Sequence, residues 1–258
     1  MAKQDYEAVH RAFRAECERN AQVAGADRAL QEKSIDWLVH SCRHKYSYNF
    51  TWLGRPIIQY PQDIVALQEL IWSVKPDLVV ETGIAHGGSL ILTASLLALL
   101  DLCEGRQEPR RVLGVDIEIR PHNRDAIERH PLAARIRLLE GSSVAEEIVA
   151  QVREEAAKAQ RVLVILDSNH THEHVLQELE HYSPLVTPGS YCVVFDTVVE
   201  HMPADFFPDR PWGPGNNPKT AVHAFLQSPA GQGFAIDRGL QDKLLITVAP
   251  DGFLKRLA

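Results

Sequence analysis

The stretch LVVETGIAHGGSLILTASLLALL, residues 78–100, joins a short β-branched run, a turn rich in glycine and a long apolar segment. The run Leu78–Thr82 has the length and composition of a buried strand, and Ser89–Leu100 has those of a helix. Between them, the glycines of ETGIAHGGS (Glu81–Ser89) allow a tight turn and let a ligand approach the first turn of the helix. The stretch therefore predicts the first strand, turn and helix of a ligand-binding α/β fold.

The same alternation continues toward the C-terminus. Further strands are expected at 111–115, 136–139, 162–166 and 191–195, and helices at 121–129, 144–158, 171–182 and 221–227. Apolar strands separated by helices are typical of a parallel sheet with helices on both faces. Two last runs, Phe234–Ile236 and Leu244–Val248, are close enough to pair as an antiparallel hairpin. The sequence thus predicts a seven-stranded, mostly parallel sheet that ends in such a hairpin.

An N-terminal extension precedes this alternation. Residues 4–43 are expected to be helical, because good helix formers dominate and apolar residues recur at helical spacing. We therefore divide the chain into a helical extension, residues 1–60, with substrate or subunit contacts, and a sheet domain, residues 61–258. Aromatic residues in the extension favour burial against another copy, so a homo-oligomer is expected.

Composition excludes several classes of protein. The 258 residues include 27 Lys plus Arg and 34 Asp plus Glu, a net charge of -7, with 45% hydrophobic residues, which is ordinary for a globular protein. No apolar run reaches the ~20 residues of a membrane span, and the first 20 residues are too charged for a secretory signal. An acidic chain without a long basic block argues against nucleic-acid binding. We expect a cytoplasmic enzyme.

Two acids point to a nucleoside cofactor at the edge of the sheet. Asp116 ends the second predicted strand, where a carboxylate can accept both hydroxyls of a ribose; the alternative is a helix N-cap ahead of Pro121. Glu81 ends a buried strand and needs a partner, which the ammonium group of S-adenosylmethionine (SAM) would supply. The spacing after Gly83 breaks the G-x-G-x-x-G pattern, which argues against a dehydrogenase. Ser142 either lies against the adenine or caps a helix.

A second group of polar residues follows the fourth and fifth predicted strands. Asp167 and Asp196 end these strands, and two adjacent carboxylates repel each other unless a cation lies between them. Oxygen ligands without a thiolate favour Mg²⁺ or Mn²⁺ over zinc. His170 can point at the same site and is the best candidate for a general base. An iron site of Asp167, His170 and His174 is the alternative.

Two further histidines and a proline-rich loop complete the candidate residues. His172 and His181 are interpreted as solvated helix positions. Five prolines within residues 201–220 exclude a helix or a central strand, so a long loop is expected there. We expect residues 198–218 to act as a lid whose aromatic side chains face the substrate; the alternative is a rigid surface or subunit-contact loop. These aromatic residues are Phe206, Phe207 and Trp212.

Several linked motifs together resemble one family. They are YSYNFTWLGRPIIQYPQDIVALQELIW (Tyr46–Trp72), ETGIAHGGS (Glu81–Ser89), LDSNHTHEHV (Leu166–Val175), LVTPGSYCVVFDT (Leu185–Thr197) and RPWGPGNNPKTAV (Arg210–Val222). The chain resembles the cephalosporin hydroxylase/rhamnosyl O-methyltransferase family. The resemblance implies a Rossmann-like class I SAM-dependent methyltransferase and, as in several relatives, Mg²⁺-dependent O-methylation of a sugar or another small hydroxylated molecule.

The resemblance also implies roles for individual residues. The residues that would line SAM are Glu81, Gly83, His86, Gly87, Ser89, Asp116, Ser142 and Asp167. Asp167 and Asp196 would hold Mg²⁺ against a vicinal diol, and His170 would remove the hydroxyl proton, with Asp167 as a substitute. Phe195 stands where relatives commonly have an acid, and Asn169 where they often have Asp, which predicts weaker Mg²⁺ binding. The alternatives are a metal-independent methyltransferase, an iron-dependent hydroxylase and a binding protein without catalysis.

Overall fold

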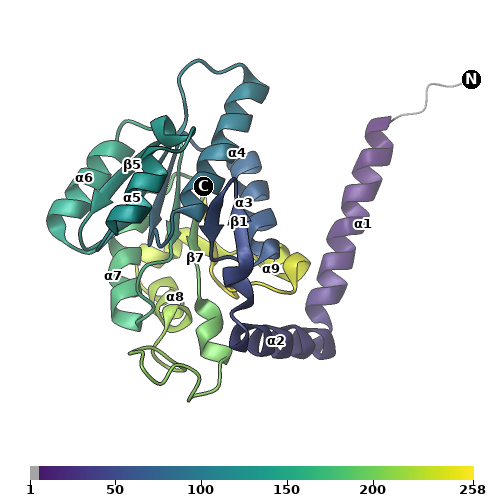
Figure 1. Ribbon diagram of the computed structural model, residues 1–258. Helices are drawn as coiled ribbons and strands as arrows, with labels where there is room; N and C mark the ends of the chain where they lie inside the picture. The colour runs from purple at the N-terminus through teal and green to yellow at the C-terminus, as the bar shows by residue number, and fades with distance from the viewer. Residues whose placement is uncertain (1–5) are drawn as a thin grey trace, which may run out of the picture.

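The computed structural model describes residues 6–258, and its centre is a seven-stranded sheet of order β5-β4-β3-β6-β7-β9-β8 (Figure 1). Its strands are β3 (Leu78–Thr82), β4 (Arg111–Asp116), β5 (Ile136–Glu140), β6 (Val162–Leu166), β7 (Tyr191–Val194), β8 (Phe234–Ile236) and β9 (Phe253–Arg256). The first five run parallel, whereas β9 pairs antiparallel with both β7 and β8. The predicted seven-stranded, mostly parallel sheet with a C-terminal antiparallel hairpin is confirmed.

Helices cover both faces of this sheet, as predicted. They are α3 (Pro61–Val74), α4 (Gly88–Glu104), α5 (Pro121–Glu128), α6 (Glu146–Ala156), α7 (His172–Tyr182), α8 (Pro218–Gln227) and α9 (Arg238–Leu244). Successive residues of β3 point to opposite faces: Val79 belongs to a core shared with α3 and α4, and Val80 to a core shared with α6, α7 and α8. The strands are therefore buried on both sides, which explains why they read as continuous apolar runs.

The N-terminal extension contains two helices and a small hairpin. Its elements are α1 (Tyr6–Ala26), α2 (Arg28–Arg43), β1 (Phe50–Trp52) and β2 (Arg55–Ile57). The helix α1 contacts α9 near its C-terminal end, and the rest of it projects away from the body (Figure 1). It has no buried residue, whereas α2 buries Leu38 in the core. None of the helices between residues 6 and 258 combines the length and the apolar character needed to cross a membrane.

Short 3-10 turns connect several of these elements. They are η1 (Tyr46–Asn49), η2 (Ala133–Arg135), η3 (Ser183–Leu185), η4 (Thr197–His201) and η5 (Ala230–Gly233). The predicted long loop is shorter than expected, because its first residues form η4 and its last residues form the first turn of α8. Pro218 begins α8 because the first helical position needs no N–H donor, and Asn217 forms a capping box with Thr220.

The prediction of a strand at Leu244–Val248 is wrong, and β9 lies later in the chain. The side chain of Asp237 accepts a hydrogen bond from the Leu240 N–H at 3.0 Å and thereby starts α9 where the sequence suggested a turn. The buried carboxylate of Asp63 then binds the next segment, accepting bonds from the Thr247 hydroxyl and, at 3.1 Å, from the Val248 N–H. The Val248 N–H is consequently not available to a sheet ladder.

We predict that Gly83→Ala loses roughly 3 kcal/mol or more of the free energy of unfolding. Gly83 has a left-handed φ of 86°, and a methyl group added there would overlap the carbonyl oxygen of Asp167. Gly54 also has a φ of 86° but has open space around it, so Gly54→Ala should lose only the backbone strain of about 1–2 kcal/mol. Urea unfolding measures both values, and equal losses would contradict the crowding at Gly83.

Candidate functional site

The candidate site lies at the carboxyl edge of the parallel strands. Glu81, Asp116, Asp167 and Asp196 lie at, or within two residues of, the carboxyl ends of β3, β4, β6 and β7. Because β3 lies between β4 and β6, and β7 pairs with β6, all four acids meet at one edge of the sheet. The crevice beyond the carboxyl ends of strands is where open α/β sheets bind ligands.

Asp116 fastens the glycine-rich turn to the second parallel strand. Its carboxylate accepts hydrogen bonds from the N–H groups of Ile84 at 2.7 Å and Ala85 at 3.4 Å. The alternative role as a helix cap is wrong, because Arg120 occupies the N-cap position of α5. These bonds fix the turn against the carboxyl end of β4.

Two side chains that the sequence analysis missed hold the other side of this turn. Arg55 of β2 donates to the carbonyl oxygen of His86 through Nη2 at 2.6 Å and Nε at 3.1 Å. Asn123 of α5 donates to the carbonyl oxygen of Ala85 at 3.0 Å and accepts from Arg55 at 3.1 Å. Arg55 lies in the motif Tyr46–Trp72 but had no assigned role, and Asn123 lies outside the quoted motifs. Their contacts span 31 to 68 residues of sequence.

Glu81 is a buried carboxyl group with one oxygen left over. It is 2% exposed, and the hydroxyl of Ser89 donates to Oε1. The second oxygen, Oε2, is buried and has no hydrogen-bond partner. Burial raises the pKa of Glu81 from its ordinary 4.5 to about 7. An unpaired buried carboxylate oxygen is costly, and a cationic ligand group beside it would stabilise the charged form.

The remaining predicted cofactor residues lie on the loops around these acids. Gly83 and Gly87, both with positive φ, begin and end the turn that carries His86, and Gly87 is the N-cap of α4. Ser142 follows β5, and its carbonyl accepts a bond from the Ala145 N–H at 3.0 Å. Its neighbour Ser143 is buried and lies 3.1 Å from the ring of His174.

Asp167, His170 and Asp196 form a compact polar cluster. One ligand atom from each lies within 4.8 Å of the others, and His170 Nε2 is 3.1 Å from Asp196 Oδ2. Burial, together with the nearby charge of Asp196, raises the pKa of Asp167 well above its usual range. Asp196 is held at a left-handed φ of 55°, a strained backbone that is typical of functional sites. A hard divalent cation fits these donors because it would relieve the repulsion.

The three residues of the iron alternative, Asp167, His170 and His174, do not come together in one group. His174 Nε2 points to Ser143 Oγ at 3.1 Å and Ser168 Oγ at 3.2 Å, and among residues 6–258 the potential metal-binding group excludes it. The interpretation of His172 as simply solvated is also incomplete, because its Nδ1 lies 2.8 Å from the Thr220 hydroxyl oxygen. His181 is half-buried near the end of α7.

The proline-rich loop reaches the cluster through one of its three aromatic side chains. Trp212 contacts His170 edge-on, with 4.8 Å between ring centroids, and the Arg210 guanidinium lies 5.1 Å from the Trp212 ring. Phe206 and Phe207 instead pack against each other and against the hydrophobic core. Phe195 is also part of that core and is 2% exposed, so the position before Asp196 supplies no ligand.

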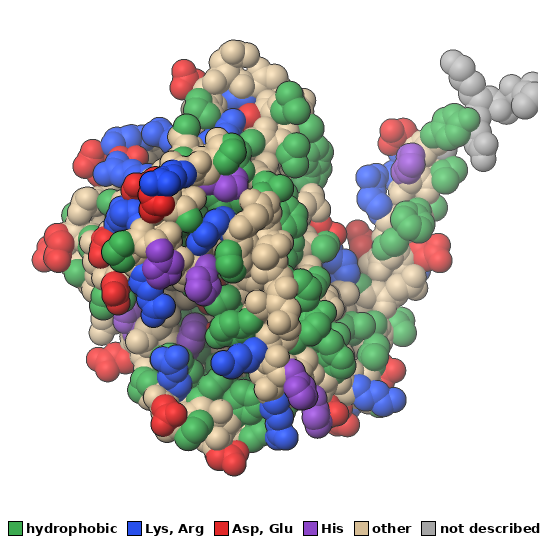
Figure 2. Space-filling model, viewed as in Figure 1, with side chains coloured by type: hydrophobic (Ala, Val, Ile, Leu, Met, Phe, Trp, Pro, Cys, Tyr) green, Lys and Arg blue, Asp and Glu red, His purple; other side chains and the backbone are tan. Residues whose placement is uncertain are grey.

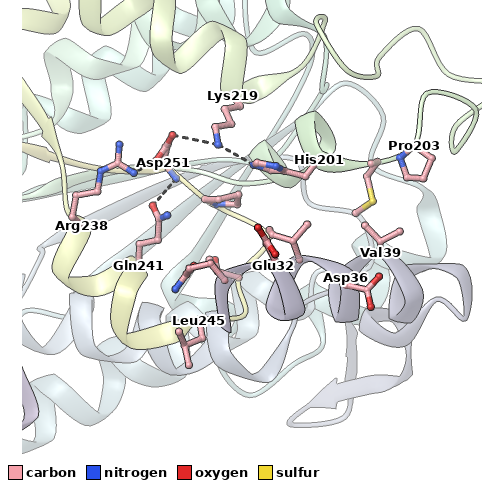
Figure 3. A pocket seen from close by; sticks show the side chains of 15 residues that line it. Glu32, Asp36, Val39, His201, Pro203, Lys219, Arg238, Gln241, Leu245 and Asp251 are labelled. Carbon is pink, nitrogen blue, oxygen red and sulfur yellow. Dashed lines mark hydrogen bonds and ion pairs between the residues drawn. The ribbon is translucent and has the colours of Figure 1, made fainter. Parts of the chain in front are cut away.

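A cavity of about 730 Å³ lies beyond the other end of η4. In Figure 3, Glu32 and Asp36 of α2 line one side, and His201, Lys219 and Asp251 line the other. Lys219 is 3.3 Å from Asp251 and 2.9 Å from the ring nitrogen of His201. The turn η4 connects this cavity to the cluster, since it begins directly after Asp196 and ends at His201.

Sequence comparisons place these features in a family. The family model described as Rhamnosyl O-methyltransferase/CmcI matches residues 44–257. The chain belongs to this family. A rhamnosyl O-methyltransferase of Mycobacterium leprae (strain TN) is 31% identical over 220 residues, which cover 83% of this chain and 88% of the relative. One of Mycobacterium bovis (strain BCG / Pasteur) is 30% identical and covers 83% of each chain.

Solved structures share the fold of this member of the rhamnosyl O-methyltransferase/CmcI family. CmcI with Mg and SAM has a TM-score of 0.51 at 18% identity, covering 82% of this chain and 78% of that chain. The MycE methyltransferase from the mycinamycin biosynthetic pathway, in complex with Mg and SAH, also has a TM-score of 0.51, at 14% identity, covering 85% of this chain and 53% of that chain. The class I methyltransferase fold expected from the sequence is thus confirmed.

We predict that Glu81→Gln changes how stability depends on pH. Because the folded state raises the pKa of Glu81 from 4.5 to about 7, its stabilising contribution is complete below pH 4.5 and is lost as pH rises through about 7. Between pH 5 and pH 8, wild type should lose roughly 2–3 kcal/mol relative to Glu81→Gln. Urea unfolding at the two pH values measures this difference. Glu118→Gln, which replaces an exposed carboxylate, is the control and should follow wild type.

Proposed function

We propose that this protein is a SAM-dependent O-methyltransferase that methylates a hydroxyl group of a sugar or of a glycosylated small molecule. The observation that carries the proposal is the position of two sites along one sheet edge, a fastened glycine turn beside Glu81 and the cluster of Asp167, His170 and Asp196. The named activity of the mycobacterial relatives supports a sugar, with a rhamnosyl group as the first candidate.

The first site has the chemistry to hold SAM. Glu81 Oε2 offers a buried anionic acceptor for the SAM ammonium group. The turn from Gly83 to Gly87 leads directly into α4 and is held by Asp116. Asp116 would contact the ribose of a bound nucleoside, and Ser142 would contact its adenine. When bound, SAM supplies the methyl group.

The second site has the chemistry to position and deprotonate a hydroxyl. Asp167 and Asp196 would hold Mg²⁺, which when bound lowers the pKa of a coordinated sugar hydroxyl. His170 would accept the hydroxyl proton, because its Nε2 lies beside Asp196, and Asp196 would stabilise the resulting imidazolium. Trp212 would keep this ring in place and exclude water from the site.

Loop 198–218 would cover the acceptor, and the extension would contact it. Glu200 pins the loop to α8 by accepting bonds from the Gly215 N–H at 2.9 Å and from the Asn217 amide. The cavity between α2 and η4 would hold the part of the acceptor that is not methylated, since η4 joins it to the cluster.

We predict that the protein transfers the methyl group of labelled SAM to a rhamnosyl glycoside and that His170→Ala lowers kcat by about 10²–10⁴-fold. Methyl transfer measured over a range of pH should show that the variant has lost the rise of rate with pH that a general base gives the wild-type profile. His181→Ala is the control and should remain active, because His181 lies at the opposite end of α7 from the cluster.

Addition of EDTA separates the alternatives in the same assay. Loss of activity in EDTA and its recovery with Mg²⁺ are expected. Full activity in EDTA would favour a metal-independent methyltransferase, whereas failure of the folded protein to bind SAM in a calorimetric titration would overturn the assignment altogether.

We further propose that α1 mediates self-association. This 21-residue helix has no buried residue, and Tyr6, Val9 and Phe13 are 51–70% exposed at helical spacing. The end of the helix that carries these side chains extends beyond the body, whereas the other end contacts α9, and hydrophobic side chains of α1 are visible in Figure 2. A projecting helix gains little stability without tertiary packing, and a second copy presents the same apolar stripe, as a symmetric contact requires.

We predict that Phe13→Glu lowers the mass of the assembly measured by light scattering. The control, Glu18→Gln, alters a different face of α1 and should leave the mass unchanged. A monomeric wild type, or an assembly of the same mass in Phe13→Glu, would contradict this role of α1.

A further inference from the structure

Gln59 brings an unassigned polar group to the Asp167 carboxylate. It lies between β2 and α3 and is 3% exposed, and its Nε2 is 3.4 Å from Asp167 Oδ2. The amide oxygen Oε1 is buried and has no hydrogen-bond partner. Both polar atoms of a buried amide normally have hydrogen-bond partners. The Gln59 amide oxygen is therefore available to a ligand.

The environment of Gln59 decides what kind of ligand suits that oxygen. Its nearest polar partner is Asp167, which lies within the 4.8 Å cluster with His170 and Asp196. A carbonyl oxygen near a carboxylate attracts a cation and repels an anion. Rotation of the amide by 180° exchanges Nε2 and Oε1, so the same side chain can donate to Asp167 or turn its oxygen toward a cation held by Asp167.

The cluster offers a hard cation only a few oxygen donors from the protein. Mg²⁺ and Mn²⁺ take six ligands, mostly oxygens, and Asp167 and Asp196 are the two carboxylates of the cluster. Phe195 precedes Asp196 but lies in the hydrophobic core and cannot contribute. Gln59 comes from the N-terminal extension and brings a neutral amide oxygen into the neighbourhood of Asp167.

We propose that Gln59 is a third protein ligand of the divalent cation at Asp167 and Asp196, through Oε1. This inference rests on the proposed metal-assisted function and adds the residue that compensates for Phe195. Without the cation, the Gln59 amide donates to Asp167 and keeps this carboxylate oriented. The N-terminal extension thereby takes part in the chemistry of the site.

Titration of the SAM-free protein with Mn²⁺, followed by the electron paramagnetic resonance signal of the free ion, tests the proposal. Gln59→Leu should weaken Mn²⁺ binding by at least about tenfold. Gln59→Glu keeps an oxygen at the same distance from the backbone and should bind Mn²⁺ at least as tightly as wild type. SAM binding by both variants, measured by calorimetry in EDTA, should equal that of wild type.

Gln62→Leu is the matched control. Gln62 lies three residues further along the chain and also has a buried amide oxygen without a partner, but its side chain has no hydrogen bond to the cluster. Its Mn²⁺ affinity should equal that of wild type, and an equal loss in Gln62→Leu would attribute the effect to general disturbance and overturn the proposal.

The other outcomes are equally decisive. Unchanged Mn²⁺ affinity in Gln59→Leu would overturn the role of Gln59 while leaving the metal at Asp167 and Asp196 intact. Weaker SAM binding in EDTA would reassign Gln59 to the cofactor. Absence of Mn²⁺ binding by wild type would remove both the metal and this ligand, and methyl transfer in EDTA would then show whether the methyltransferase function itself survives.

Discussion

Glu81, Asp167 and Asp196 stand at or just beyond the ends of neighbouring buried strands, where the charges of Glu81 and Asp196 raise the free energy of an ionised Asp167. Burial and these charges raise the pKa of Asp167, and burial alone raises that of Glu81 to about 7. Folding therefore holds these acids at positions where their charged forms are destabilised, and the parallel sheet fixes those positions. A cationic cofactor and a divalent cation would both relieve this repulsion, so the same crowding that weakens the fold creates affinity for ligands.

The backbone at this edge depends on contacts between distant segments. Gly83 leaves room for the backbone of Asp167, and Gly88 leaves room for Pro56 of β2. Arg55 holds the glycine-rich turn, and Gln59 reaches Asp167. The segment before residue 61 is consequently part of the site. The division into an extension and a sheet domain describes the order of elements along the chain, but the candidate site takes residues from both.

Much of the fold followed from local patterns. The strands at 78–82 and 162–166 were predicted with their observed bounds, because fully buried strands are short apolar runs between turn residues. The strand at 253–256 was missed, because its residues FLKR carry no strong pattern and Leu244–Val248 is more apolar. That segment is instead bound by Asp63, a buried carboxylate more than 180 residues earlier in the chain.

For the candidate site, the sequence by itself determined which acids lie together, since the carboxyl ends of parallel strands meet at one edge whatever the loops do. It could not show what those acids bind within the protein. Only the tertiary structure decided that Asp116 and Arg55 hold the turn, that His170 rather than His174 joins the cluster, and that Gln59 contacts it. Such contacts depend on packing between segments far apart in sequence, which leaves no periodic signal in either segment.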